Sequence, residues 1–226
     1  DHAEAASDEY PAARHVVILG VNQEPTIFNY ELLLQERGGE LQAGLRRLSD
    51  LAAQAKVWLT VPQRLASWAA GAFAGLAEVV ALPDAYRDRV ERLVVARVTG
   101  LRVPPTVPYR ARGAAVLSVE QALAALDALQ GRPFIRKTVT IAGDGVGEPV
   151  TLRAPLGTSV RDLLAARGLC ASDFARVVMG GPMQGAALYT DETYLSKFQH
   201  GVYLARAARP DAATNLACVN CGRCTR

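Results

Sequence analysis

From residue 15 to residue 131, short β-branched apolar runs alternate with longer stretches whose apolar residues recur at helical spacing. The predicted strands are His15–Leu19, Lys56–Val61 and Glu78–Leu82. The predicted helices lie between Tyr30 and Ala55 with a break at Gly38 and Gly39, from Pro62 past Phe73, from about Ala85 to Val98, and from an N-cap at Ser118 to about Leu129. This alternation predicts an α/β domain with a mostly parallel sheet over residues 1–131.

Beyond residue 131 the pattern changes to closely spaced strands around one short helix. The predicted strands are Thr138–Ile141, Pro149–Arg153, Arg176–Met179 and Val202–Leu204. Thr158 or Ser159 is expected to cap the helix, whose inner face carries Val160, Leu163 and Leu164. Two strands, a helix and two more strands predict a small α+β domain of β-grasp type over residues 132–208, followed by a separate segment, 209–226.

Composition and charge narrow the class of protein. Half of the 226 residues are apolar, which is enough for a sizeable core, and 25 basic residues are interspersed with 22 acidic ones. We therefore expect no nucleic-acid partner. We also expect no transmembrane segment, because glycines and Glu78 interrupt the most apolar window, Leu65–Leu82. The first residues lack the order of a signal peptide. These features predict a cytoplasmic location, with peripheral attachment to the inner face of the membrane left open.

Three of the four cysteines, Cys218, Cys221 and Cys224, fall within seven residues near the C-terminus. Their C-x-x-C-x-x-C spacing matches three of the four ligands of a bacterial [4Fe–4S] run, whose fourth cysteine would follow Arg226. In a reducing compartment, such clustered thiols are more often metal ligands than disulfides. Two other interpretations stay open: unliganded thiols, or a zinc site completed by His200 or Cys170. Otherwise we expect Cys170 to be a small core residue.

Three motifs in the second half carry a family resemblance. They are Arg132–Thr140, Pro155–Val160 and Val177–Gly185, with the cysteines following in order. Together they resemble the SLBB (soluble-ligand-binding β-grasp) domain of the C subunit of the Rnf electron-transport complex and of related cobalamin reductases. The resemblance implies an oxidoreductase subunit that passes electrons from NADH through FMN to [4Fe–4S] clusters and partner subunits. It makes 209–226 the start of a ferredoxin-like segment, and we expect these 226 residues alone to be inactive.

The first domain is more weakly similar to the flavin-binding region of the same proteins and of the NADH-oxidising subunit of complex I. The match is Gly20–Pro25, and it implies that Asn22 and Glu24 bind a cofactor. The chain keeps Glu24 and Pro25, but Asn22 replaces the family's first glutamate. The glycine-rich loop that cradles the flavin phosphate in those relatives is absent from the 226 residues. We therefore do not expect this chain alone to bind FMN well.

Two further sites have open interpretations. Gly180, Gly181, Pro182 and Met183 form either a ligand-facing loop or a structural turn between strands. Arg132, Arg136 and Lys137 form either a basic patch for a partner subunit or an acidic ligand, or, as we favour, a solvated strand edge. No catalytic pairing of Ser, His and Asp or of Cys and His stands at a recognisable spacing. The alternative function is a non-enzymatic module that binds a soluble ligand or a partner subunit.

Overall fold

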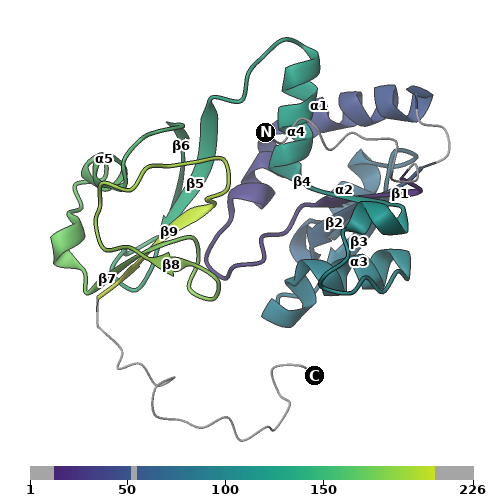
Figure 1. The fold of residues 1–226 in the computed structure, drawn as a ribbon. Helices are drawn as coiled ribbons and strands as arrows, with labels where there is room; N and C mark the ends of the chain where they lie inside the picture. The colour runs from purple at the N-terminus through teal and green to yellow at the C-terminus, as the bar shows by residue number, and fades with distance from the viewer. Residues whose placement is uncertain (1–12, 52–54, 207–226) are drawn as a thin grey trace, which may run out of the picture. The chain divides into compact units, whose positions relative to one another are not determined.

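The computed structural model describes residues 13–51 and 55–206, which divide into two compact units (Figure 1). The first unit comprises the described residues up to Gln23 together with Phe28–Phe134. The second comprises Glu24–Ile27 and the described residues from Ile135 onward. The second unit is therefore discontinuous in sequence, which the hydrophobic pattern did not indicate.

The first unit is built on a four-stranded parallel sheet. Its strands are β1 (His15–Leu19), β2 (Lys56–Pro62), β3 (Glu78–Leu82) and β4 (Ala114–Ser118), in the order β3-β2-β1-β4. His15 is in register with Lys56 on one side and with Ala114 on the other. The strand order reverses beside β1, and in open parallel sheets ligands bind at the carboxyl ends of the strands at such a point.

Helices cover both faces of this sheet. They are α1 (Asn29–Leu51), α2 (Ala66–Ala72), α3 (Glu91–Thr99) and α4 (Val119–Leu129), with short 3₁₀ turns η1 (Gln63–Leu65), η2 (Tyr86–Arg89) and η3 (Tyr109–Arg112). Side chains of a strand alternate between faces, so Ile18 joins the cluster of Leu34 and Leu123, whereas Val17 joins that of Val94. The first cluster packs β1 against α1 and α4, and the second packs it against α3.

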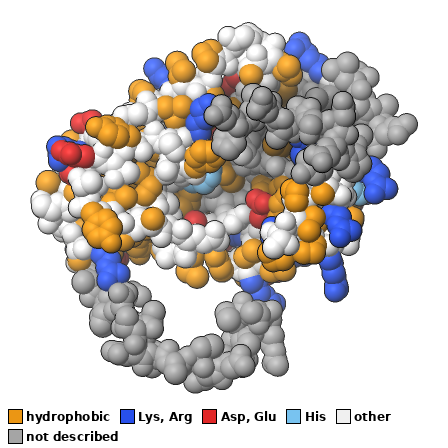
Figure 2. All heavy atoms as spheres, in the orientation of Figure 1, with side chains coloured by type: hydrophobic (Ala, Val, Ile, Leu, Met, Phe, Trp, Pro, Cys, Tyr) orange, Lys and Arg blue, Asp and Glu red, His pale blue; other side chains and the backbone are white. Residues whose placement is uncertain are grey.

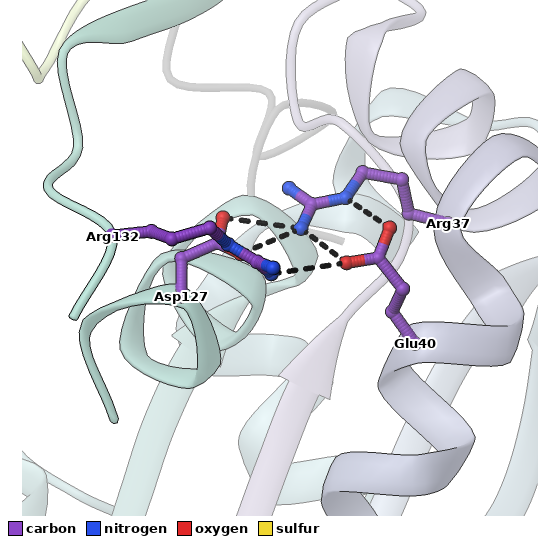
Figure 3. A network of polar contacts seen from close by, with 4 residues as sticks. All are labelled: Arg37, Glu40, Asp127 and Arg132. Carbon is purple, nitrogen blue, oxygen red and sulfur yellow. Dashed lines mark hydrogen bonds and ion pairs between the residues drawn. The ribbon is translucent and has the colours of Figure 1, made fainter. Parts of the chain in front are cut away.

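Helix α1 is kinked where the sequence predicts a break. The backbone leaves helical geometry at Arg37 (φ −116°, ψ 16°), one residue before Gly38. Figure 3 shows that the Arg37 guanidinium donates hydrogen bonds to Glu40 (2.8 Å from Nε to Oε1) and to Asp127 of α4 (2.9 Å from Nη2 to Oδ1). Arg132 donates to the same Asp127 carboxylate. Although burial opposes the effect, the hydrogen bonds from Arg37 and Arg132 hold the pKa of Asp127 below its usual range.

Three elements of the first unit differ from the predictions. Strand β4 was not predicted, because Ala114 and Ala115 are small and the run lacks a polar alternation. Pro62 ends β2 instead of opening the next helix. The helix predicted over 85–98 is divided at Val90, where the backbone is extended between η2 and α3.

The second unit is a mixed five-stranded sheet with one short helix. Its elements are β5 (Arg136–Ala142), β6 (Val150–Pro155), α5 (Val160–Ala165), η4 (Ala171–Asp173), β7 (Arg176–Met179), β8 (Ala186–Ala187) and β9 (Gly201–Ala205). The strand order is β6-β5-β9-β7-β8, and the central β5 and β9 are parallel. Leu164 of α5 packs in one cluster with Val139 and Val202. The predicted fold class, a parallel α/β domain followed by a small β-grasp-type sheet, is confirmed.

The distribution of charged side chains and the lengths of the described helices agree with what the composition predicts. Figure 2 shows basic and acidic side chains scattered among hydrophobic ones on the face that it presents. Within residues 13–51 and 55–206, no helix combines the length and the apolar character that crossing a membrane requires.

Candidate functional site

Buried polar side chains gather where β1 and β4 end. The residues concerned, each less than a tenth exposed, are Asn22, Asn29, Tyr30, Glu31, Ser118 and Glu120. Ser118 ends β4, Asn22 lies in the loop after β1, and the others lie in the first turn of α1 or α4. The sequence singled out only Asn22 as a ligand and Ser118 as a helix cap. The available signal was the polar residues that follow β1, a run that the sequence predicts as a buried strand; the part of the group at β4 had no such signal, because β4 was not predicted.

Asn22 forms hydrogen bonds through both its amide nitrogen and its amide oxygen. Its Nδ2 donates to Asn29 Oδ1 at 2.5 Å, and its Oδ1 accepts the Tyr30 backbone N–H at 3.0 Å. The side chain is 2% exposed and joins the loop after β1 to the start of α1. Asn22 thus has a clear structural role, and its role in cofactor binding stays a prediction.

Tyr30, Ser118 and Glu120 form a connected group. Burial raises the pKa of Tyr30, a hydrogen bond with the Ser118 side chain opposes this, and the negative charges of Glu120 and Glu91 raise the pKa further. The tyrosine therefore keeps its proton at neutral pH. Ser118 also caps α4, because its Oγ accepts the Gln121 N–H at 3.1 Å while Gln121 Oε1 accepts the Ser118 N–H at 2.8 Å.

Glu31 supplies a buried carboxylate at the same edge. The residue is 3% exposed, and its Oε2 forms an ion pair with Arg64 of η1. Its Oε1 has no hydrogen-bond partner among the residues that the structure describes. A buried acceptor without a partner is costly, so this atom favours a ligand that brings a hydrogen-bond donor. With Glu120 nearby in the first turn of α4, the edge disfavours a phosphate.

The described residues do not fit a flavin phosphate. A phosphate cradle needs backbone N–H groups from a glycine-rich turn. The glycine after β1, Gly20, serves packing instead, because a Cβ there would lie 2.4 Å from the carbonyl oxygen of Thr60 in β2. Val21, Asn22 and Gln23 follow it, so no such turn forms between β1 and α1. That this chain alone binds FMN poorly stays a prediction.

Glu24 lies in the second unit, beside the predicted ligand loop. Its Oε2 accepts the backbone N–H of Met183 at 2.8 Å. Gly181 lies so close that an added Cβ would be 2.4 Å from Glu24 Cβ. The structure thus brings Glu24 and Gly180–Met183 together, whereas Asn22 belongs to the first unit. The cofactor role of Glu24 and the ligand role of the loop stay predictions.

The loop connects β7 to β8, and backbone hydrogen bonds fix its conformation. Gly180 takes a positive φ of 106°, and its N–H donates to the carbonyl oxygen of Gly201 at 2.7 Å. The N–H of Gly185 donates to the carbonyl oxygen of Gly181 at 3.0 Å. These contacts make the segment a defined turn on β9.

The three basic residues after residue 131 do not form a solvated edge together. Lys137 is 1% exposed, and its Nζ lies 3.2 Å from Nδ1 of His200. Burial, with the charge of Lys137, lowers the pKa of His200 to about 3. Arg136 is exposed, and Arg132 is hydrogen-bonded to Asp127. The interpretation of Lys137 as a solvated edge residue is wrong, because its side chain is buried in the interior of the second unit.

The cysteine predictions have two outcomes. Cys170 is exposed, with its Sγ 3.0 Å from Ser172 Oγ, so its expected place in the core is wrong. Cys218, Cys221 and Cys224 lie outside the described residues. In the part of the chain that the structure describes, no group of three His, Cys, Asp or Glu residues could hold a metal ion.

Comparison with solved structures defines the class of fold. The chain matches a chain of the crystal structure of an NAD⁺-reducing [NiFe]-hydrogenase in the air-oxidised state, with a TM-score of 0.62 and 20% identity. The match covers 87% of this chain and 41% of that chain. At this identity the match shows the fold alone, an α/β unit followed by a mixed-sheet unit. No protein-family model matches the chain.

Curated sequences identify the relatives more closely. The chain is 30% identical, over 93% of its length, to the C subunit of the ion-translocating oxidoreductase complex of Pseudomonas aeruginosa, and 26% identical over 93% to that of Rhodobacter capsulatus. It is 35% identical over 54% of its length to cobalamin reductase PduS of Citrobacter freundii. These comparisons confirm the resemblance drawn from the sequence: the chain is a protein of the Rnf C-subunit type. It spans 28%, 42% and 27%, respectively, of the length of these relatives.

Proposed function

We propose that this chain is part of an electron-transfer subunit that, in the intact protein, carries electrons from NADH through FMN to [4Fe–4S] clusters and on to partner subunits. The observation that carries the proposal is the similarity to the Rnf-type C subunit, which extends over 93% of the chain and so includes both structural units. The names of the Pseudomonas aeruginosa and Rhodobacter capsulatus relatives describe a subunit of an ion-translocating oxidoreductase complex. Such a subunit would attach to its complex peripherally, on the cytoplasmic side of the membrane.

The proposed cluster ligands are Cys218, Cys221 and Cys224. Thiolates at this spacing suit iron, and the fourth ligand would come from sequence beyond Arg226. When bound, the cluster would supply one-electron chemistry. The protein would supply the thiolates and the surroundings that set the cluster's potential.

The role proposed for the α/β unit is to bind the ribose or amide part of the nicotinamide nucleotide at the carboxyl edge of its sheet, with the phosphates held outside that edge. Glu31 Oε1 is a buried acceptor there without a partner among the described residues. Hydroxyl or amide groups of a nucleotide are donors of the kind that it favours. The edge lacks a phosphate cradle, so FMN would be held by other parts of the intact protein.

The cysteine assignment is tested with a form of the protein extended past Arg226 by its natural sequence. After anaerobic reconstitution, we expect iron and sulfide in equal amounts, about four of each per cluster, and a sulfur-to-iron charge-transfer band. Cys221→Ser should lose most of the bound iron and sulfide and most of the charge-transfer band. Cys170→Ser is the matched control, because Cys170 is exposed and stands apart from the triplet. Equal loading of the two variants, or zinc in place of iron, would contradict the assignment.

A second candidate is a module that binds a soluble ligand or partner subunit without redox chemistry. The lack of a phosphate cradle after β1 favours it. If the extended protein takes up neither iron nor flavin, this candidate replaces the first.

A further inference from the structure

The segment Glu24–Ile27 is seated in the second unit by specific contacts. It stands between β1 and α1 in the chain, yet it groups with the mixed sheet. The Glu24 carboxylate accepts the Met183 N–H, as described above. At the other end of the segment, Ile27 is completely buried. The segment is thus held at both ends.

The glycines of the second unit are complementary to this segment. A Cβ on Gly181 would lie 2.2 Å from Glu24 Oε2, and a Cβ on Gly201 would lie 2.3 Å from Ile27 Cδ1. Gly201 pairs with Thr140 in the sheet, and its carbonyl oxygen accepts the Gly180 N–H. Gly181, in the loop after β7, and Gly201, in β9, therefore leave space for the two ends of the Glu24–Ile27 segment.

The segment also holds a conformation that is unfavourable by itself. Thr26 has φ of 66°, and it is the only residue other than glycine with positive φ among those described. For a β-branched residue this backbone is strained, and Thr26 Oγ1 is buried without a hydrogen-bond partner in the described structure. Such a conformation persists only when its surroundings impose it.

We propose that the occupant of the Gly180–Met183 loop is the Glu24–Ile27 segment of the same chain, and that Gly181 and the Met183 N–H are positioning groups for Glu24. A soluble ligand would then have to displace this segment to reach the loop. The inference goes beyond the electron-transfer proposal and stands without it, because it concerns only contacts within the second unit.

Hydrogen exchange of the whole chain tests the proposal without any cofactor. In the wild type we expect the Met183 amide to be protected. Glu24→Ala should raise its exchange rate ~10-fold, the effect of losing one charge-assisted hydrogen bond. Glu24→Gln should keep most of the protection, because its amide oxygen can still accept the bond. This rescue distinguishes the hydrogen bond from general packing.

Gly181→Ala provides the second arm. It should raise exchange at both the 24–27 segment and the Met183 amide, while the amides of β5 keep their protection and report an intact sheet. Gly147→Ala is the matched control, because nothing lies within 4 Å of a Cβ there and its φ is not positive. An unprotected Met183 amide in the wild type, or no change in Glu24→Ala, would overturn the proposal.

Discussion

Lys137 and His200 place two basic groups side by side in the interior of the second unit. The two nitrogens are 3.2 Å apart, and burial together with the lysine charge lowers the pKa of the imidazole to about 3. The native state therefore holds His200 neutral at physiological pH, with a ring nitrogen able to accept a hydrogen bond from the ammonium group. In the unfolded chain the same imidazole takes up a proton near its ordinary pKa of 6.5.

This difference predicts a pH dependence of stability. A histidine whose pKa is lowered on folding favours the native state above its unfolded pKa, and that advantage falls as the pH drops from about 6.5 toward about 3. Between about pH 7 and about pH 5 the free energy of unfolding should fall by about 2 kcal/mol on account of His200. Urea unfolding of the wild type and of His200→Gln, at both pH values, measures this change in the free energy of unfolding. The variant should lose less stability, and equal losses would refute the assignment.

The burial of Lys137 could not be read from the sequence. Arg132, Arg136 and Lys137 stand close together along the chain, but alternate residues of a strand face opposite sides. Lys137 faces the same side of β5 as Val139 and Ile141, which are core residues. The alternation of the strand therefore places the lysine on the core face, but its burial also depends on its contact with His200, 63 positions away. Only the tertiary structure brings those two together.

At the scale of elements, α1 and α4 approach each other closely through a glycine. A Cβ added to Gly44 of α1 would lie 2.3 Å from Leu126 Cδ1 of α4. Gly39, about one and a half turns earlier on the same helix, has nothing within 4 Å of its Cβ position. One glycine thus permits packing, and the other lowers helix propensity without a compensating contact.

These two glycines give a matched pair of substitutions. Gly44→Ala should destabilise the protein by about 1–3 kcal/mol, because a well-packed interface must shift to admit the methyl group. Gly39→Ala should stabilise it by roughly 0.5–1 kcal/mol, the gain in helix propensity. Chemical denaturation midpoints of both variants check the signs. A Gly44→Ala variant at least as stable as the wild type would show that α1 and α4 do not meet closely at Gly44.

Elements were predictable where the local signal was strong. The bounds of His15–Leu19, Glu78–Leu82 and Arg176–Met179 agree with the sequence prediction because each run is short, apolar and β-branched. Strand β4 lacks that signal, and β8 has only two residues. The polar cluster at the sheet edge also depends on β4, because the register of Leu19 with Ser118 is what places Ser118 beside the loop after β1. Without β4, that site could not be predicted.

On the scale of the whole molecule, the second unit takes its Glu24–Ile27 segment from a distant part of the sequence. A family motif identified Glu24 and Pro25, and another identified Gly180–Met183, but neither indicated that they meet. Contacts between residues 159 positions apart depend on the fold of both segments, and hydrophobic periodicity carries no information about them. The three cysteines near the C-terminus lie outside the described residues, so their interpretation rests on their spacing and on family resemblance.

The central claim, electron transfer from NADH through FMN to a cluster held by the three cysteines, is tested most directly by electron paramagnetic resonance. The full-length protein is reconstituted anaerobically with iron, sulfide and FMN, and is then mixed with NADH. The account predicts a signal from a reduced [4Fe–4S] cluster in the wild type that is lost in Cys221→Ser and kept in Cys170→Ser. A cluster that dithionite reduces but NADH leaves oxidised would contradict it.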